Sequence, residues 1–154
     1  MKLDLGAGAA SPPGFTPLGR RFGSEIYPLS QIADNTVEEV RASHCLEHFP
    51  HKEIAAILRE WVRVLKPGGL LKIAVPDFRK IAKNYLDGVS QPTQGYVMGG
   101  QIDADDFHKS LFDTARFAGH IESAFFTMWQ RGQQGLAPGH IHVQPEVARQ
   151  AERS

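Results

Sequence analysis

Residues 43–49 (SHCLEHF) contain two histidines and a glutamate whose spacing could hold a metal ion. His44, Glu47 and His48 form the H-x-x-E-H pattern, in which two imidazoles four residues apart share one helix face and can bind zinc. Pro50 follows closely and disfavours a helix through this stretch, and nothing elsewhere indicates a third ligand. We interpret the segment as a strand-to-helix loop with partly exposed histidines. We predict no bound metal, and zinc hydrolysis is a remote alternative.

A glycine turn at the start of the chain is the second segment that could do chemistry. Residues 3–8 (LDLGAG) predict a short buried strand that opens onto Gly6 and Gly8. Ligands of open α/β sheets bind beyond the carboxyl ends of strands, and glycines there let a ligand approach the backbone without meeting a Cβ atom. The free amides of such a turn can contact a polar or anionic group. The third glycine of the dinucleotide fingerprint is absent, so pyrophosphate recognition is not predicted.

A helix and a strand in the middle of the chain would position these segments. Apolar residues between Ile54 and Leu65 recur at i, i+3, i+4, i+7 and i+11, which predicts an amphipathic helix. The sequence Pro67-Gly68-Gly69 ends that helix in a tight turn. The apolar run 70–75 then predicts a strand buried on both faces.

The flanking regions predict further elements. Asp77 can cap a second helix with Phe78 on its buried face, and Asp113 can cap a third. The region of about residues 88–110 has no period and contains Gly95, Gly99 and Gly100, which predicts a long loop or lid. Phe126–Gln130 and His140–Gln144 predict two closing strands, antiparallel because their connection is too short for a crossover. The other predicted strands lie at residues 15–18, 25–27 and 37–43.

This order of elements predicts an α/β fold with a mixed, mainly parallel sheet. We expect a single domain over residues 1–144 and a polar tail over residues 145–154.

The chain has 154 residues, of which 17 are Lys or Arg and 17 are Asp or Glu. The resulting zero net charge gives no electrostatic footprint for nucleic acid or an anionic membrane, and it is compatible with a homodimer.

The single cysteine and the hydropathy of the chain indicate in which cellular compartment the protein is expected. The lone Cys45 cannot form an internal disulfide, which disfavours a stapled secreted scaffold; we expect it to be a buried small hydrophobe. The first residues carry no apolar signal region, and no run approaches the roughly 18 apolar residues that a membrane helix needs. The expectation is a cytoplasmic protein with a small-molecule substrate and no nucleic-acid or membrane partner.

Four sequence blocks in this order resemble the class I S-adenosylmethionine-dependent methyltransferases. They are LDLGAG (3–8), ASHCLEHF (42–49), REWVRVLKPGG (59–69) and LLKIAVPDF (70–78). More narrowly, they are similar to a small group of predicted, type 11-like methyltransferases, and the resemblance covers about residues 3–144. It implies a Rossmann-like sheet of about seven strands with helices on both faces and a C-terminal antiparallel hairpin.

The resemblance also implies a site for S-adenosylmethionine. Asp4, Gly6, Ala7 and Gly8 would border the methionine part of this cofactor on one side, and Ser43, His44 and Leu46 on the other. Asp77, Tyr96 and His108 would face the acceptor. His108 is the candidate general base, because an imidazole titrates near neutral pH, with a solvated loop histidine as the alternative. Asp77 is better explained as a helix cap.

The implied activity is methyl transfer to a small-molecule or glycan-precursor acceptor. The alternative is a non-catalytic binding protein that retains the fold, because Gly19 and Leu29 occupy positions where the family has carboxylates for ribose and adenine. Glu25 or Asp34 could replace these carboxylates if the short strands shift. We expect Gly6→Val to abolish cofactor binding in a folded protein and Phe78→Ala to cost about 3–5 kcal/mol.

Overall fold

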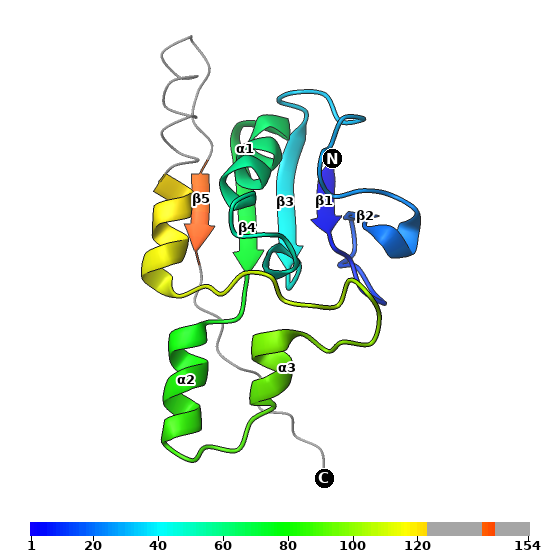
Figure 1. The fold of residues 1–154 in the computed structure, drawn as a ribbon. Helices are drawn as coiled ribbons and strands as arrows, with labels where there is room; N and C mark the ends of the chain where they lie inside the picture. The colour runs from blue at the N-terminus through cyan, green and yellow to red at the C-terminus, as the bar shows by residue number, and fades with distance from the viewer. Residues whose placement is uncertain (123–139, 144–154) are drawn as a thin grey trace.

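The computed structural model describes residues 1–122 and 140–143, and the statements below refer to this part of the chain. Its centre is a sheet with the strand order β2-β1-β3-β4-β5 (Figure 1). Every neighbouring pair is parallel. The strands are β1 (Lys2–Leu5), β2 (Thr16–Leu18), β3 (Val37–Ser43), β4 (Leu65–Ala74) and β5 (His140–Val143).

The α/β class and the parallel pairing are confirmed. The described residues form five strands and not the predicted seven, and they do not show the predicted antiparallel hairpin. Strand β5 lies where a closing strand is predicted, but Leu70 pairs with His140 in parallel register. The long connection through residues 75–139 permits this arrangement, since a parallel neighbour needs a crossover. The predicted hairpin partner at 126–130 lies outside the described residues.

One face of the sheet forms the core together with α1 (Ile54–Val64). Leu3, Val40 and Leu71 occupy one cross-strand row and are at most 1% exposed. The helix covers this face (Figure 1) and inserts Trp61, which has no exposed surface. Each such side chain contributes roughly 1.5–3 kcal/mol on burial. The predicted amphipathic helix is therefore confirmed, and it orients the carboxyl ends of β1 and β3.

The opposite face of the sheet is charged. Asp4 pairs with Arg41 at 2.5 Å, and Glu39 accepts from Lys2 at 3.0 Å and from Lys72 at 2.5 Å. Because side chains alternate along a strand, the predicted burial of residues 70–75 on both faces is wrong: the Lys72 side chain is 53% exposed. Within the described residues, helices do not cover both faces.

The helix stop at Pro67-Gly68-Gly69 is placed correctly, but these residues do not form a separate turn. They lie inside β4, where the register with β3 shifts between the pairs Val37–Leu65 and Glu39–Leu70. Gly68 has a φ of 77°, which a glycine adopts without strain. The strand therefore begins directly after α1 and contains an irregularity.

No strand forms at the predicted residues 25–27. The backbone carbonyl of Ile26 instead accepts a 2.8 Å hydrogen bond from Nε1 of Trp61. A side chain of α1 therefore holds this segment, not a neighbouring strand.

The two helices that directly follow β4, α2 (Phe78–Leu86) and α3 (Thr93–Met98), lie beyond the carboxyl ends of the strands (Figure 1). Asp77 caps α2, as predicted, by accepting from the Lys80 amide. Phe78 is 39% exposed, so its predicted burial is wrong. The predicted loop 88–110 contains the short helix α3.

The predicted third helix is confirmed as far as the structure describes it. Residues 114–122 are helical, Asp113 accepts from the Arg116 amide, and Phe117 and Ile121 are buried. Among the described residues, no helix has the length and apolar character needed to cross a bilayer.

Candidate functional site

Three strand ends meet at the glycine turn. Gly6 follows β1, Gly19 follows β2 and Cys45 closely follows β3. A Cβ atom on Gly6 would overlap with the Cβ of Cys45, and one on Gly19 would lie 3.5 Å from the Cα of Gly6. Since β2 and β3 flank β1 on opposite sides, this point is where the strand order switches, the usual position of ligand crevices in such sheets. The predicted convergence of the opening turn and the segment around Ser43 is confirmed.

The same contact corrects the expectation for Gly6→Val. Gly6 has a φ of 67°, and its Cα hydrogens face Cys45. A side chain at position 6 would therefore collide with the chain itself before it met any ligand. The variant should be destabilised, and would not report on cofactor binding in an intact fold.

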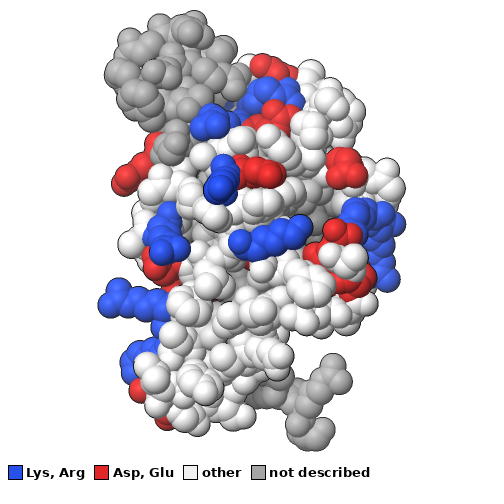
Figure 2. Space-filling view, in the orientation of Figure 1, with Lys and Arg blue, Asp and Glu red and all other residues white. Residues whose placement is uncertain are grey.

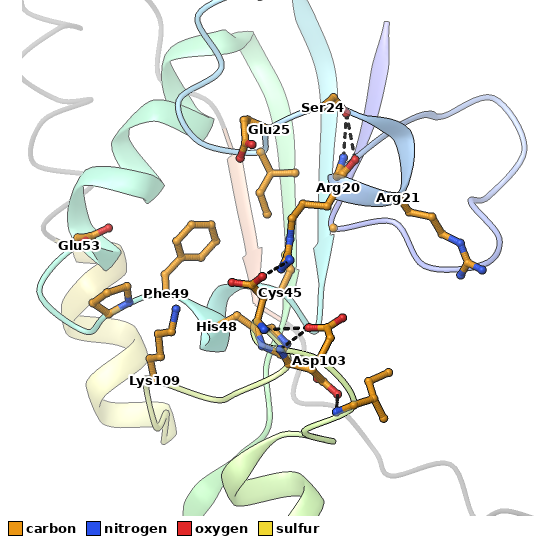
Figure 3. Close-up of a pocket in the computed structure, with 17 residues that line it drawn as sticks. Arg20, Arg21, Ser24, Glu25, Cys45, His48, Phe49, Glu53, Asp103 and Lys109 are labelled. Carbon is orange, nitrogen blue, oxygen red and sulfur yellow. Dashed lines mark hydrogen bonds and ion pairs between the residues drawn. The ribbon is translucent and has the colours of Figure 1, made fainter.

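A pocket of about 850 Å³ opens at this switch point (Figure 3). Its floor is formed by Gly6, Gly19 and Cys45 at the strand ends. Its walls come from η1 (Arg20–Phe22), the segment 24–26, and the stretch that begins at η2 (Leu46–His48) and continues to residue 53. Lid residues 102–109 form the remaining side. The charged lining residues are Arg20, Arg21, Glu25, Glu53, Asp103, Asp105, Asp106 and Lys109.

The lid is shaped by its glycines. Gly99 has a φ of 84°, and a Cβ atom there would overlap with the backbone oxygen of Asp106. The chain returns on itself through two hydrogen bonds, from the Gln101 amide to the Asp106 carbonyl at 2.9 Å and from the His108 amide to the Met98 carbonyl at 3.1 Å. An ion pair between Arg20 and Asp105 then connects the lid with η1 across the pocket.

The end of the lid is attached to η2 through backbone groups. The amides of Lys109 and Ser110 both donate to the carbonyl of Glu47, at 2.7 and 3.1 Å. The Ser110 hydroxyl donates to the Phe49 carbonyl at 2.6 Å. These bonds bring His108 next to the predicted H-x-x-E-H segment, although the two lie about sixty residues apart in the sequence.

Glu47 is buried at the centre of this junction. It is 1% exposed, and neither carboxylate oxygen accepts a hydrogen bond from the described residues. Its Oε1 lies 3.4 Å from Nδ1 of His44 and 3.9 Å from Nε2 of His108. The Leu46–His48 segment is a short 3₁₀ helix that does not include His44. The two imidazoles of the motif therefore do not share an α-helical face.

The structure brings one of the predicted cofactor-binding residues, Gly6, to the pocket lining. Asp4 belongs to the charged sheet face and pairs with Arg41. Leu46 is fully buried, and Ala7 is 8% exposed. Gly8, Ser43 and His44 are likewise outside the residues that line the pocket. A cofactor role for these residues stays a prediction.

The structure does not bring the three predicted acceptor-side residues, Asp77, Tyr96 and His108, together at one place. Asp77 is engaged as the cap of α2, whereas the backbone oxygen of Tyr96 lies 3.0 Å from Nδ1 of His108. None of the three lines the pocket. The pocket residues that the sequence analysis did not name include Asp105 and Lys109. Both lie in the predicted loop 88–110, which was the available signal.

Charges at the site are mixed in sign. Figure 2 shows acidic and basic side chains beside one another on the face it presents. Burial, followed by the nearby charges of Glu47 and Asp4, raises the pKa of the Cys45 thiol far above its ordinary value. Cys45 is therefore a protonated, buried side chain, as predicted, and not a nucleophile.

The two positions without the expected carboxylates have different surroundings. Gly19 lies at the pocket floor, and Glu25 lines the same pocket. Leu29 is fully buried. Asp34 forms an ion pair with Arg63 of α1 at 2.5 Å, so only Glu25 of the two possible substitutes lies at the pocket.

Comparison with known families agrees with the block pattern. Residues 22–73 match the model of a family described as a methyltransferase domain, which belongs to the class I S-adenosylmethionine-dependent methyltransferases. This segment runs from η1 through α1 into β4 and contains the complete ASHCLEHF and REWVRVLKPGG blocks. No curated protein and no solved structure matches the chain.

Proposed function

We propose that the protein is an S-adenosylmethionine-dependent methyltransferase that acts on a small-molecule or glycan-precursor acceptor. The observation that carries this proposal is the pocket at the carboxyl ends of β1, β2 and β3, at the switch point of a sheet whose central segment matches a methyltransferase domain. Fold alone does not identify a substrate, so the acceptor class rests on the resemblance.

The size and charge of the pocket support this assignment. A volume of about 850 Å³ lies within the range of about 300–1,000 Å³ that is usual for ligand pockets. Five carboxylates line it against three Lys or Arg side chains, and one of these cations, Arg20, is paired with Asp105. A net acidic lining favours a cationic ligand such as a sulfonium nucleoside.

The residues of this chain would mainly bind and align the two reactants. S-adenosylmethionine supplies an already activated methyl group, so alignment in a water-poor site is the principal requirement. The Gly6 turn and Gly19 offer backbone without side chains at the floor, and Glu25 offers a carboxylate for hydroxyl groups. The lid, tied to η1 through Arg20 and Asp105, limits the access of water.

No dedicated base is needed for this function. Asp77 is occupied as a helix cap. His108 directs Nε2 toward Glu47, while Tyr96 is 36% exposed on α3. We retain Tyr96 and His108 as proposed acceptor-side residues without assigning them a proton-transfer step.

A specific observation also supports the alternative of a non-catalytic binding protein. Gly19 and the buried Leu29 supply no carboxylate for ribose or adenine, and the described connection from β1 to β2 contains no helix. A missing charge-assisted hydrogen bond costs about 1.5–3 kcal/mol, or about ten- to a hundredfold in affinity. Weak cofactor binding without turnover would match this alternative.

The two functions are separated by a methyl-transfer assay. The full chain is incubated with radiolabelled S-adenosylmethionine and mixtures of small hydroxylated, aminated and sugar-nucleotide acceptors. Transfer of label that is lost in Glu25→Gln but retained in the matched variant Glu38→Gln, on the exposed start of β3, supports the enzyme. Saturable cofactor binding with no transfer to any acceptor class supports the binding protein.

A further inference from the structure

Glu47, His48 and His108 form a cluster to which the proposed methyl transfer assigns no chemical step. Each residue offers one ligand atom, and these three atoms lie within 4.8 Å of one another. Glu47 and His48 belong to η2, and His108 belongs to the end of the lid. His108 thus joins Glu47 and His48 from a distant part of the sequence, whereas His44, the first residue of the H-x-x-E-H motif, does not belong to the cluster.

The carboxylate of Glu47 is buried, and the nearest basic nitrogens, on His44 and His108, lie 3.4 and 3.9 Å from its Oε1. Glu47 is 1% exposed, and its two oxygens accept no hydrogen bond within the described part of the chain. Burying an ionised carboxylate without hydrogen bonds or a paired charge is strongly unfavourable. A dication held between Glu47 and the neighbouring imidazoles would remove this cost.

The two histidines are oriented as metal ligands usually are. Nδ1 of His48 lies 3.2 Å from the carbonyl oxygen of Phe107, and Nδ1 of His108 lies 3.0 Å from that of Tyr96. A carbonyl oxygen only accepts, so each Nδ1 carries a proton, and Nε2 is the atom that each neutral imidazole offers to a metal. This outer hydrogen bond to the non-ligating nitrogen is the typical second shell of a metal-bound histidine.

The backbone keeps the three ligands together without a metal. The amides of Lys109 and Ser110 donate to the Glu47 carbonyl, and the rings of His48 and His108 pack edge to face with centroids 5.0 Å apart. Ligand atoms around a tetrahedral metal lie about 3.3 Å apart. The cluster thus needs only side-chain rotation to close around an ion.

We propose that Glu47, His48 and His108 bind one borderline transition-metal dication such as Zn²⁺, Co²⁺ or Fe²⁺. Two imidazole nitrogens and one carboxylate oxygen favour these ions over Mg²⁺ and Ca²⁺, which prefer oxygen ligands. Three protein ligands leave at least one coordination position open, and His48 also lines the pocket. The site does not depend on the methyltransferase proposal.

Metal titration of the full chain, prepared without a histidine tag and stripped with a chelator, tests this site. We expect one equivalent of Co²⁺ to bind with a visible d–d absorption band and Zn²⁺ to displace it. Glu47→Gln, His48→Ala and His108→Ala should each weaken binding at least about tenfold. Circular dichroism and thermal unfolding of the metal-free variants verify that they fold.

Two control variants make the result specific. His51→Ala alters an exposed histidine three residues after His48 in the sequence and should leave the dissociation constant unchanged. His44→Ala tests the sequence motif itself and should change it less than His108→Ala does. The proposal is overturned if no stoichiometric ion binds, if His51→Ala weakens binding as much as the cluster variants, or if His108→Ala has no effect while His44→Ala abolishes binding.

Discussion

Gly6 and Cys45 lie so close together that no side chain fits at position 6. A Cβ atom on Gly6 would overlap with the Cβ of Cys45, and the φ of Gly6 is 67°. This contact joins the carboxyl end of β1 to the segment after β3 and forms part of the pocket floor. A glycine is required here by the packing of the chain as well as by its backbone conformation.

Gly6→Ala should therefore destabilise the protein by at least about 2 kcal/mol, because left-handed strain and steric overlap add. Gly8→Ala is the matched control. A Cβ there would meet nothing within 4 Å, and the expected change is within about 0.5 kcal/mol. Denaturant unfolding measures both values.

A double variant separates the overlap from the strain. Cys45→Gly removes the opposing Cβ atom, so Gly6→Ala should cost less in the Cys45→Gly background than in the original chain. Additive free energies of unfolding would mean that the contact does not determine the cost.

The exposure of Phe78 and the burial of Ile57 predict stability losses of different size when each side chain is truncated to alanine. Phe78 is 39% exposed, whereas Ile57 of α1 has no exposed surface. Ile57→Ala should cost about 2–5 kcal/mol. Phe78→Ala should cost less than about 1.5 kcal/mol, since much of the side chain already contacts solvent. Equal losses in thermal unfolding would contradict the placement of α2.

The lid conformation depends on Gly99. Gly99→Ala would place a Cβ atom against the Asp106 carbonyl, so we expect faster proteolysis within residues 99–108 and weaker cofactor binding, with little change in global stability. Gly95→Ala, where a Cβ would meet nothing within 4 Å, should leave the cleavage rate unchanged. Identical cleavage patterns in the two variants would contradict the role of Gly99 in the turn of the lid.

The Glu60–Arg63 pair predicts a dependence of stability on acid pH. The hydrogen bond from the Arg63 guanidinium holds the pKa of Glu60 below its ordinary value of 4.5. A lowered folded-state pKa contributes stability that is fully present above pH 4.5 and is lost as the pH falls through the folded pKa. Glu60→Gln should therefore reduce stability at pH 7 more than at pH 3. A loss of equal size at both values would contradict this.

Local sequence patterns predicted the elements that local interactions determine. The spacing of apolar residues located α1, and Asp77 and Asp113 were identified as caps, because periodicity and capping act over a few residues. The segment 25–27 was wrongly predicted as a strand, since a hydrogen bond from the distant Trp61 decides its conformation. The direction of β5 likewise depends on a long connection and not on its own sequence.

The part of the site that is formed by the ends of the strands could be predicted from the sequence. The part that is formed by the lid could not. The convergence of the Gly6 turn with the segment after β3 follows from parallel topology. The burial of Glu47 and its proximity to His108 depend on backbone bonds from residues 109 and 110 to η2. No local pattern in either segment indicates such a contact.

The central claim is that the pocket floored by Gly6, Gly19 and Cys45 binds a sulfonium nucleoside. Isothermal titration of the full chain with S-adenosylmethionine and S-adenosylhomocysteine tests it most directly. We predict saturable binding of both at one site per chain, weakened by Glu25→Gln but not by Glu38→Gln. Absence of heat from either nucleoside at millimolar concentration would contradict the account.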